Sequence, residues 1–127
     1  VFGFGEAVDF TDLVNKNAVL EFEVRTNQKG LEFETYFRDK FVSESDENGY
    51  EWRCAKSFIT RDFPPDGKWH KVSVPLKDFK PTGAWLTQKG EWVSDKGLFS
   101  WKKVDALVFS FIKDIKDGIS IRNIVIK

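Results

Sequence analysis

Short runs in which apolar and polar residues alternate dominate this chain. In residues 18–26, Leu, Phe and Val alternate with charged side chains, and residues 31–37 repeat the pattern after the turn residues 27–30. Successive side chains of a strand point to opposite faces, so each run predicts a strand with one buried face. We expect the two strands to pair as a hairpin that has one apolar and one charged side.

Residues 67–79 contain the strand around which we expect the fold to be organised. Apolar residues alternate with lysine and serine up to Pro75. Proline has no amide hydrogen, which predicts that this strand lies at a sheet edge or leaves the sheet at that point. A short reversal after Pro75 is expected to bring Phe79 back onto the core.

Further strands are predicted at residues 50–60, 104–112 and 119–126, with a shortened first strand within residues 1–10. The 104–112 strand is apolar on both faces, which favours a central position. The facing of the 50–60 strand stays open. Either Tyr50, Trp52 and Cys54 point inward, or a bulge switches the buried side on the way to Phe58.

Two segments lack a clear strand pattern. A single helical turn is expected after Phe10, capped by Thr11 or Asp12 and ending near residues 15–17. Residues 80–103 form the longest irregular stretch, within which a short hairpin near residues 88–91 is one alternative. Loops of this length in compact domains are usually functional or disordered, and the three tryptophans in this one argue against disorder.

Short strands separated by turns predict an all-β fold, with two antiparallel sheets packed as a β-sandwich. The 127 residues fit one domain, and no internal repeat or linker divides residues 1–127. Because the chain begins at Val1 and contains no Met, we expect it to be cut from a larger or processed polypeptide.

Charge and cysteine content narrow the function classes. Twenty basic and twenty acidic residues cancel, so nothing favours nucleic acid or an anionic membrane as partner, and no apolar run could span a bilayer. The one cysteine, Cys54, is expected to be an apolar filler. The one histidine, His70, has no second histidine to complete a metal site, and a dyad of His70 with Cys54 has no further support.

Aromatic residues are the unusual part of the composition, with thirteen Phe, five Trp and two Tyr. Phe is typical of cores, whereas five tryptophans exceed what so small a core requires. We therefore expect some indole rings to be exposed for binding.

Four segments, in order, resemble a known family. They are residues 20–25, the run Gly-x-Trp-x-x-Val-x-Val-Pro-Leu-x-x-Phe at residues 67–79, residues 107–111, and Ile-Ser-Ile-Arg-Asn-Ile at residues 119–124. Together they resemble non-catalytic carbohydrate-binding modules with a galactose-binding-like jelly-roll fold, and the resemblance covers most of the chain.

The resemblance implies a function and a setting. Such modules are appended to polysaccharide-degrading enzymes and bind glycan on a concave sheet face or in rim loops. The expected partners are therefore a polysaccharide or oligosaccharide and a catalytic domain in the same chain, outside the cell or at its surface. Many members hold a structural calcium near an acidic residue of the last strand, where this chain has Arg122. We predict no cofactor.

Sugar binding requires aromatic rings for the apolar faces of pyranoses and polar groups for their hydroxyls. The predicted ligand-binding residues are Trp52, Trp85, Trp92, Trp101, Glu34, Tyr36 and Arg38. Trp69 belongs to the family motif and is expected to serve the sandwich itself. Glu32, Glu21, Glu23 and Arg25 are expected beside the polar group, mostly as surface ion pairs.

Three alternatives remain. Glu32 and Glu34 lie two residues apart on one strand, about 6.5–7 Å between Cα atoms, a spacing that a glycoside hydrolase could use. The third acid of the laminarinase-type motif is missing, which argues against catalysis. A structural sandwich could instead pack its tryptophan-rich loop on a neighbouring domain. The run Asp-Phe-x-Pro-Thr at residues 78–82 resembles assembly-factor domains related to mitochondrial complex I, which favours a protein partner.

Overall fold

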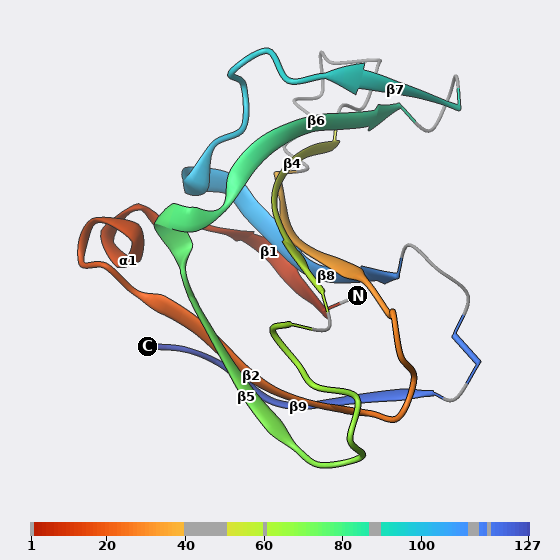
Figure 1. The fold of residues 1–127 in the computed structure, drawn as a ribbon. Helices are drawn as coiled ribbons and strands as arrows, with labels where there is room; N and C mark the ends of the chain where they lie inside the picture. The colour runs from red at the N-terminus through yellow and green to blue at the C-terminus, as the bar shows by residue number, and fades with distance from the viewer. Residues whose placement is uncertain (1, 40–50, 60, 87–89, 112–114, 117) are drawn as a thin grey trace.

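The computed structural model describes residues 2–39, 51–59, 61–86, 90–111, 115–116 and 118–127. Its strands form two antiparallel sheets packed as a sandwich (Figure 1), which confirms the predicted fold class. The elements are β1 (Phe2–Val8), α1 (Thr11–Asn15), β2 (Val19–Thr26), β3 (Phe33–Asp39), β4 (Glu51–Phe58), β5 (His70–Pro75), η1 (Leu76–Asp78), β6 (Lys80–Leu86), β7 (Glu91–Ser94), η2 (Trp101–Lys103), β8 (Val104–Phe111) and β9 (Ile119–Ile126).

One sheet has six strands in the order β1-β8-β3-β4-β6-β7, and the other has three in the order β5-β2-β9. Phenylalanines fill the space between the sheets. Phe22 of the small sheet makes edge-on contacts with Phe58 at 5.6 Å and Phe109 at 5.3 Å between ring centroids. Such pairs stabilise a core beyond the area that they bury. The alternation in β2, β3 and β8 predicts these inward positions correctly.

The predicted hairpin of residues 18–26 and 31–37 is wrong. β2 pairs with β5 and β9, whereas β3 pairs with β4 and β8 in the other sheet. The chain crosses from sheet to sheet between them, so that Phe22 faces Phe33 across the core with ring centroids 6.1 Å apart. Two strands with one apolar face each can bury it equally well by stacking as by pairing.

The organising strand is confirmed. β5 is an edge strand of the small sheet, and Pro75 ends it. The 3-10 turn η1 follows and returns Phe79 to the core, where its ring lies 5.1 Å from that of Phe37. The missing amide of Pro75 therefore costs no sheet hydrogen bond inside the sandwich.

β4 and β8 answer the two open questions of facing, except for Tyr50, which lies outside the described residues. Trp52, Cys54 and Phe58 are all buried and share a side of β4, so no bulge switches the side within β4. β8 lies between β1 and β3, as expected of a central strand, and Val108 is buried on its outer face.

Residues 80–103 are more regular than predicted. β6 and β7 form a hairpin that extends the large sheet, as the alternative near residues 88–91 suggested, and the amide of Gly90 donates to the carbonyl of Leu86 at 2.8 Å. The predicted cap of α1 is wrong, because Phe10 is the N-cap residue, and the amide of Thr11 donates to Oδ1 of Asp9 at 2.8 Å. None of the helices in the described part of the chain has the length and apolar character needed to cross a membrane.

Candidate functional site

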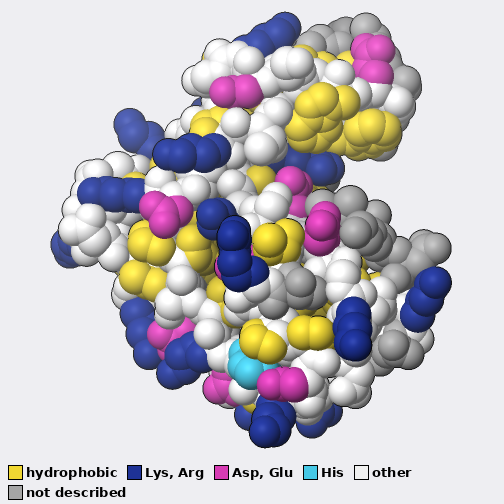
Figure 2. All heavy atoms as spheres, viewed as in Figure 1, with side chains coloured by type: hydrophobic (Ala, Val, Ile, Leu, Met, Phe, Trp, Pro, Cys, Tyr) yellow, Lys and Arg dark blue, Asp and Glu magenta, His cyan; other side chains and the backbone are white. Residues whose placement is uncertain are grey.

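The outer face of the six-stranded sheet carries the exposed tryptophans. The sheet curves from β1 to β7 (Figure 1), and a notch separates the β6–β7 hairpin from the rest of the molecule in Figure 2. Hydrophobic side chains gather on the side of the hairpin that borders this notch (Figure 2). Trp85 and Trp92 are directly opposite each other in the β6–β7 register and are 39% and 44% exposed. We call these two rings the tryptophan platform.

A glycine holds Trp92 in place. Gly83 is the β6 residue opposite Arg53, and its φ of +136° is one that residues with a side chain rarely adopt. A Cβ at this position would lie 2.7 Å from the Trp92 ring and would also collide with the carbonyl oxygen of Val93. The bare glycine therefore lets the indole lie close against the sheet.

An arginine connects the platform to the middle of the sheet. The guanidinium carbon of Arg53 lies 4.3 Å from the ring centroid of Tyr36 and 5.2 Å from that of Trp92. Cations over aromatic faces at such distances are attracted by the ring quadrupole. Tyr36, Arg53 and Trp92 thus form a stack that runs across β3, β4 and β7, which we call the arginine stack.

A second arginine on this face is paired with a carboxylate. Nε and Nη2 of Arg38 donate to the two carboxylate oxygens of Asp105 at 3.0 and 3.1 Å. The β3–β8 register shifts at Asp105, because Arg38 is opposite Ala106 whereas Asp39 is opposite Val104. The hydrogen bonds to Asp105 raise the pKa of Arg38 above its ordinary value. Bidentate pairs of this kind fix both partners in one orientation.

Small apolar residues form the floor beneath these polar groups. Tyr36 packs with Ala55, Ala106 and Val108 in a second buried cluster on the outer side of the sheet. Burial raises the pKa of the Tyr36 phenol, so its hydroxyl stays protonated at neutral pH. Small side chains here leave room above the sheet for the stack.

The predicted site residues divide into two groups. Trp85, Trp92, Tyr36, Arg38 and Glu34 share the outer face of the large sheet, with Glu34 opposite Ser57 and Ser110. Tyr36 is only 7% exposed because Arg53 covers its ring, so it supports the surface more than it presents one.

The other two tryptophans of the prediction point elsewhere. Trp52 is on the inner side of β4 and 8% exposed, so the expectation that it forms part of an exposed platform is wrong. Trp101 is part of η2, and its ring packs against Phe37 and Phe99 at 5.1 and 5.2 Å between centroids. It is partly buried against the core cluster, so it is not part of the tryptophan platform, and its predicted contact with ligand stays a prediction.

Glu21, Glu23 and Arg25 do not lie beside Glu34. They belong to β2, whose outer face is on the far side of the sandwich. The error follows directly from the hairpin that does not form. Trp69 lies on that far side as well, between the guanidinium carbons of Arg25 at 4.8 Å and Arg122 at 3.8 Å.

Sequence reasoning missed Arg53 and Asp105. Arg53 could have been found from the alternation of β4. If Trp52 and Cys54 point inward, Arg53 between them must point outward. No such signal existed for Asp105, because the irregular register of β8 decides its direction.

Cysteine and metal chemistry find no support in the described residues. Burial raises the pKa of the Cys54 thiol to about 12, so it is protonated at neutral pH. His70 belongs to the other sheet, where its Nε2 lies 2.7 Å from Asp66. Within the described ranges, no group of three or more His, Cys, Asp or Glu side chains is placed to hold a metal ion.

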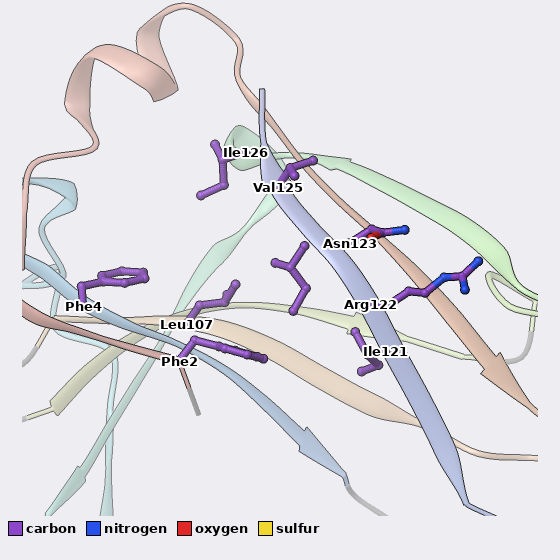
Figure 3. Close-up of a pocket in the computed structure, with 9 residues that line it drawn as sticks. Phe2, Phe4, Leu107, Ile121, Arg122, Asn123, Val125 and Ile126 are labelled. Carbon is purple, nitrogen blue, oxygen red and sulfur yellow. The ribbon is translucent and has the colours of Figure 1, made fainter.

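A separate hollow of about 590 Å³ lies between β1 and β9 (Figure 3). Phe2, Phe4 and Leu107 line one side and the isoleucines of β9 line the other. Arg122 and Asn123 also contribute to its lining, but their side chains point away from the apolar walls (Figure 3). A sugar site needs polar groups beside its apolar walls, so we do not assign the glycan to this hollow.

The geometry of the large sheet agrees with what the sequence resembles. Residues 3–127 match the family model Carbohydrate binding domain 30. The chain belongs to this family of carbohydrate-binding domains. The domain is therefore a non-catalytic carbohydrate binder, and the reading of Glu32 and Glu34 as a hydrolase pair is set aside. Comparisons with curated proteins and with solved structures gave no match.

Proposed function

We propose that this carbohydrate-binding domain holds an attached glycoside hydrolase on polysaccharide, and that the outer face of its six-stranded sheet is the glycan-binding surface. The observation that carries the site is the tryptophan platform beside the arginine stack. Two exposed indole rings stand directly opposite each other on adjacent strands. Guanidinium and carboxylate groups lie on the same face of the sheet.

The chemistry fits a neutral sugar chain. The apolar faces of pyranose rings stack on indoles through dispersion and the hydrophobic effect, each contact being weak. Several contacts along a chain are therefore needed for useful affinity. The open notch in Figure 2 gives room for a chain to lie against the platform.

The benefit to a parent enzyme is an effective concentration. Linking a binding domain to a catalytic domain turns the second encounter into an intramolecular one, at about millimolar effective concentration for a short flexible linker. A polysaccharide outside the cell is too large and polar to cross a membrane, so a domain that targets an enzyme to such a substrate would act outside the cell or at the cell surface.

Affinity electrophoresis tests the binding surface. The purified domain is run through gels that contain β-glucan, xylan, mannan or galactan, and retardation by at least one of them is expected. Tryptophan fluorescence titrated with the matching oligosaccharide should change, because the platform indoles would pass from water to a sugar face. No retardation and no fluorescence change would favour the structural or protein-partner alternative.

The tethering step needs a separate test. A polypeptide that contains both this domain and a hydrolase is compared with the same polypeptide lacking the domain. We expect slower hydrolysis of insoluble polysaccharide on deletion and an unchanged rate on soluble oligosaccharide. Equal loss on both substrates would mean that the domain supports folding of the enzyme rather than targeting.

A further inference from the structure

Arg53 differs from Arg38 and Arg122, the two arginines of the outer faces that donate to carboxylates. Arg38 donates to Asp105, and Arg122 donates to Glu23 at 2.8 Å. Among the described residues, none accepts a hydrogen bond from Arg53, and its Nε is shielded from solvent. A guanidinium carries five N–H donors, so its hydrogen-bonding capacity is not used by any residue that the structure describes.

The arginine stack fixes this unused group in one place. Tyr36 lies 4.3 Å from the guanidinium carbon and Trp92 lies 5.2 Å away. Long flexible side chains normally lose conformational freedom when they bind a ligand, and prior stacking reduces that cost. Arg53 is therefore a preorganised donor beside the platform.

We propose that Arg53 is the specificity-determining residue of the site and recognises a neutral hexopyranose. Its Nη groups donate to two neighbouring hydroxyl oxygens of a sugar whose apolar face lies on the tryptophan platform. Donors in the rigid fork of arginine match a pair of oxygens at a fixed spacing, which a sugar provides only when its hydroxyls have the right stereochemistry. This inference rests on the proposed function, because it assumes that the glycan occupies this face.

The charges of the face favour a neutral sugar over an acidic one. Arg38 and Arg53 are opposite each other in the β3–β4 register. Asp105 pairs with Arg38, and the carboxylates of Glu34 and Glu51 also act on this neighbourhood through their charge. Among the described residues, these two guanidinium groups and Lys80, which is opposite Ala55, share the face with three carboxylates, so a uronate would meet no excess of positive charge from them.

Two substitutions at Arg53 separate the fork from the charge. Arg53→Lys keeps the charge and loses the planar fork, whereas Arg53→Met keeps an apolar stem and loses both. Hydrogen bonds to charged groups of this kind correspond to a loss in affinity of about tenfold to a hundredfold. We expect both variants to lose affinity to this extent for the oligosaccharide that the wild type binds. Full affinity in Arg53→Lys would show that charge alone is recognised and would overturn the proposal.

Arg25→Met provides the matched control. Arg25 also stacks on an indole, that of Trp69, but on the outer face of the small sheet. Its removal should leave glycan affinity unchanged. A loss equal to that of Arg53→Met would mean that any stacked arginine supports the domain generally, and the proposal would be wrong.

Changes to the ligand show whether Arg53 contacts the sugar directly or only positions the ring of Trp92. Monodeoxy analogues of the bound oligosaccharide are titrated against the wild type and Arg53→Met in a double-mutant cycle. The hydroxyl that Arg53 contacts should cost affinity in the wild type and nothing further in the variant. Additive losses at every hydroxyl would show that Arg53 only positions the ring.

The outcomes separate this inference from the proposed function. A wild-type domain that binds no glycan on this surface refutes the proposed site. A wild-type domain whose affinity Arg53→Met leaves intact refutes the role of Arg53 alone. Tighter binding to a polyuronate, such as polygalacturonate, than to neutral glucan, xylan, mannan or galactan would contradict the neutral preference.

Discussion

Both outer faces of the sandwich carry arginines stacked on aromatic rings, but the arrangement of the two residue types differs between them. On the small sheet, Trp69 lies between two arginines, and Arg122 donates to Glu23 at 2.8 Å. On the large sheet, Arg53 lies between Tyr36 and Trp92 with no accepting partner among the described residues. One face is an aromatic flanked by cations, and the other is a cation flanked by aromatics.

On the small-sheet face, the carboxylates of Glu21 and Glu23 are hydrogen-bonded or paired within the protein. Glu21 accepts from Ser73 at 3.1 Å and pairs with Lys127 at 3.0 Å, and Glu23 also accepts from Asn123 at 3.2 Å. These groups already have partners from the protein, so a sugar would have to displace them. The large-sheet face has exposed rings and unused donors. Aromatic and charged residues therefore mark a binding surface only where the protein leaves them unsatisfied.

Removal of the tryptophan platform should give the largest effect. Trp85→Ala with Trp92→Ala removes both stacking surfaces, at about 2 kcal/mol each if a ring loses most of its apolar contact. We expect glycan retardation in affinity electrophoresis to disappear. Trp69→Ala should keep full affinity and lose only about 1 kcal/mol of stability from its arginine contacts. Loss of binding in Trp69→Ala instead would reverse the comparison of the two faces.

A change at Gly83 should displace the platform without removing it. Gly83→Ala introduces a Cβ against the Trp92 ring and the Val93 carbonyl at a φ of +136°. We expect a cost of about 1–3 kcal/mol in unfolding free energy and a parallel fall in glycan affinity. Chemical denaturation and fluorescence titration measure the two. Gly3→Ala is the control, because no other atom lies within 4 Å of the Cβ that this substitution adds. This variant should change neither the unfolding free energy nor the glycan affinity.

Acid should weaken the ion pairs of the small-sheet face. Hydrogen bonds from Lys127 and Arg122 lower the pKa of Glu21 and of Glu23, respectively, below the ordinary value of 4.5. A depressed folded-state pKa gives stability that is present above the unfolded pKa and lost as pH falls through the folded one. The melting temperature should therefore fall below about pH 4.5.

The glutamine variant isolates this contribution. Glu21→Gln with Glu23→Gln should melt at a lower temperature than wild type at pH 6, and the difference should shrink towards pH 3. A constant difference across that range would mean that other carboxylates control the acid response.

Salt should produce the smallest change. At about 1 M ionic strength the Debye length falls to about 3 Å, and exposed ion pairs contribute at most about 1 kcal/mol. We expect a slight fall in melting temperature and less than about a twofold change in affinity for a neutral glycan. A steep fall in affinity with salt would show that charge pairing holds the ligand.

Local pattern was enough to predict most strands and the character of their faces. The alternation of β2 and β3 and the proline that ends β5 were sufficient for the sandwich. Pattern does not report which strand pairs with which, because backbone hydrogen bonding is the same for any partner. The false hairpin of β2 with β3 shows this, and it placed Glu21 and Glu23 beside the wrong sheet.

The site residues were predictable where they lie in a strand, because the strand decides to which face each side chain points. Trp85 and Trp92 lie in a hairpin that the sequence offered only as an alternative, and their opposition depends on its register. Trp101, from the same stretch, turns to the core because a 3-10 turn follows rather than a strand. The arginine stack could not be predicted from the sequence, because it depends on contacts between three strands and on the space that Gly83 leaves for the Trp92 indole.

The β6–β7 hairpin stands apart from the phenylalanine core. None of the buried residues of the main core cluster comes from the described residues 80–86 and 90–94, although Ala84 and Leu86 of β6 are buried. Substitutions at the exposed positions of these two strands, such as Trp85 and Trp92, can therefore alter which ligand is held at little cost to folding. Such a division of labour makes the domain easy for evolution to retune, and it marks the hairpin as the segment to randomise in a library.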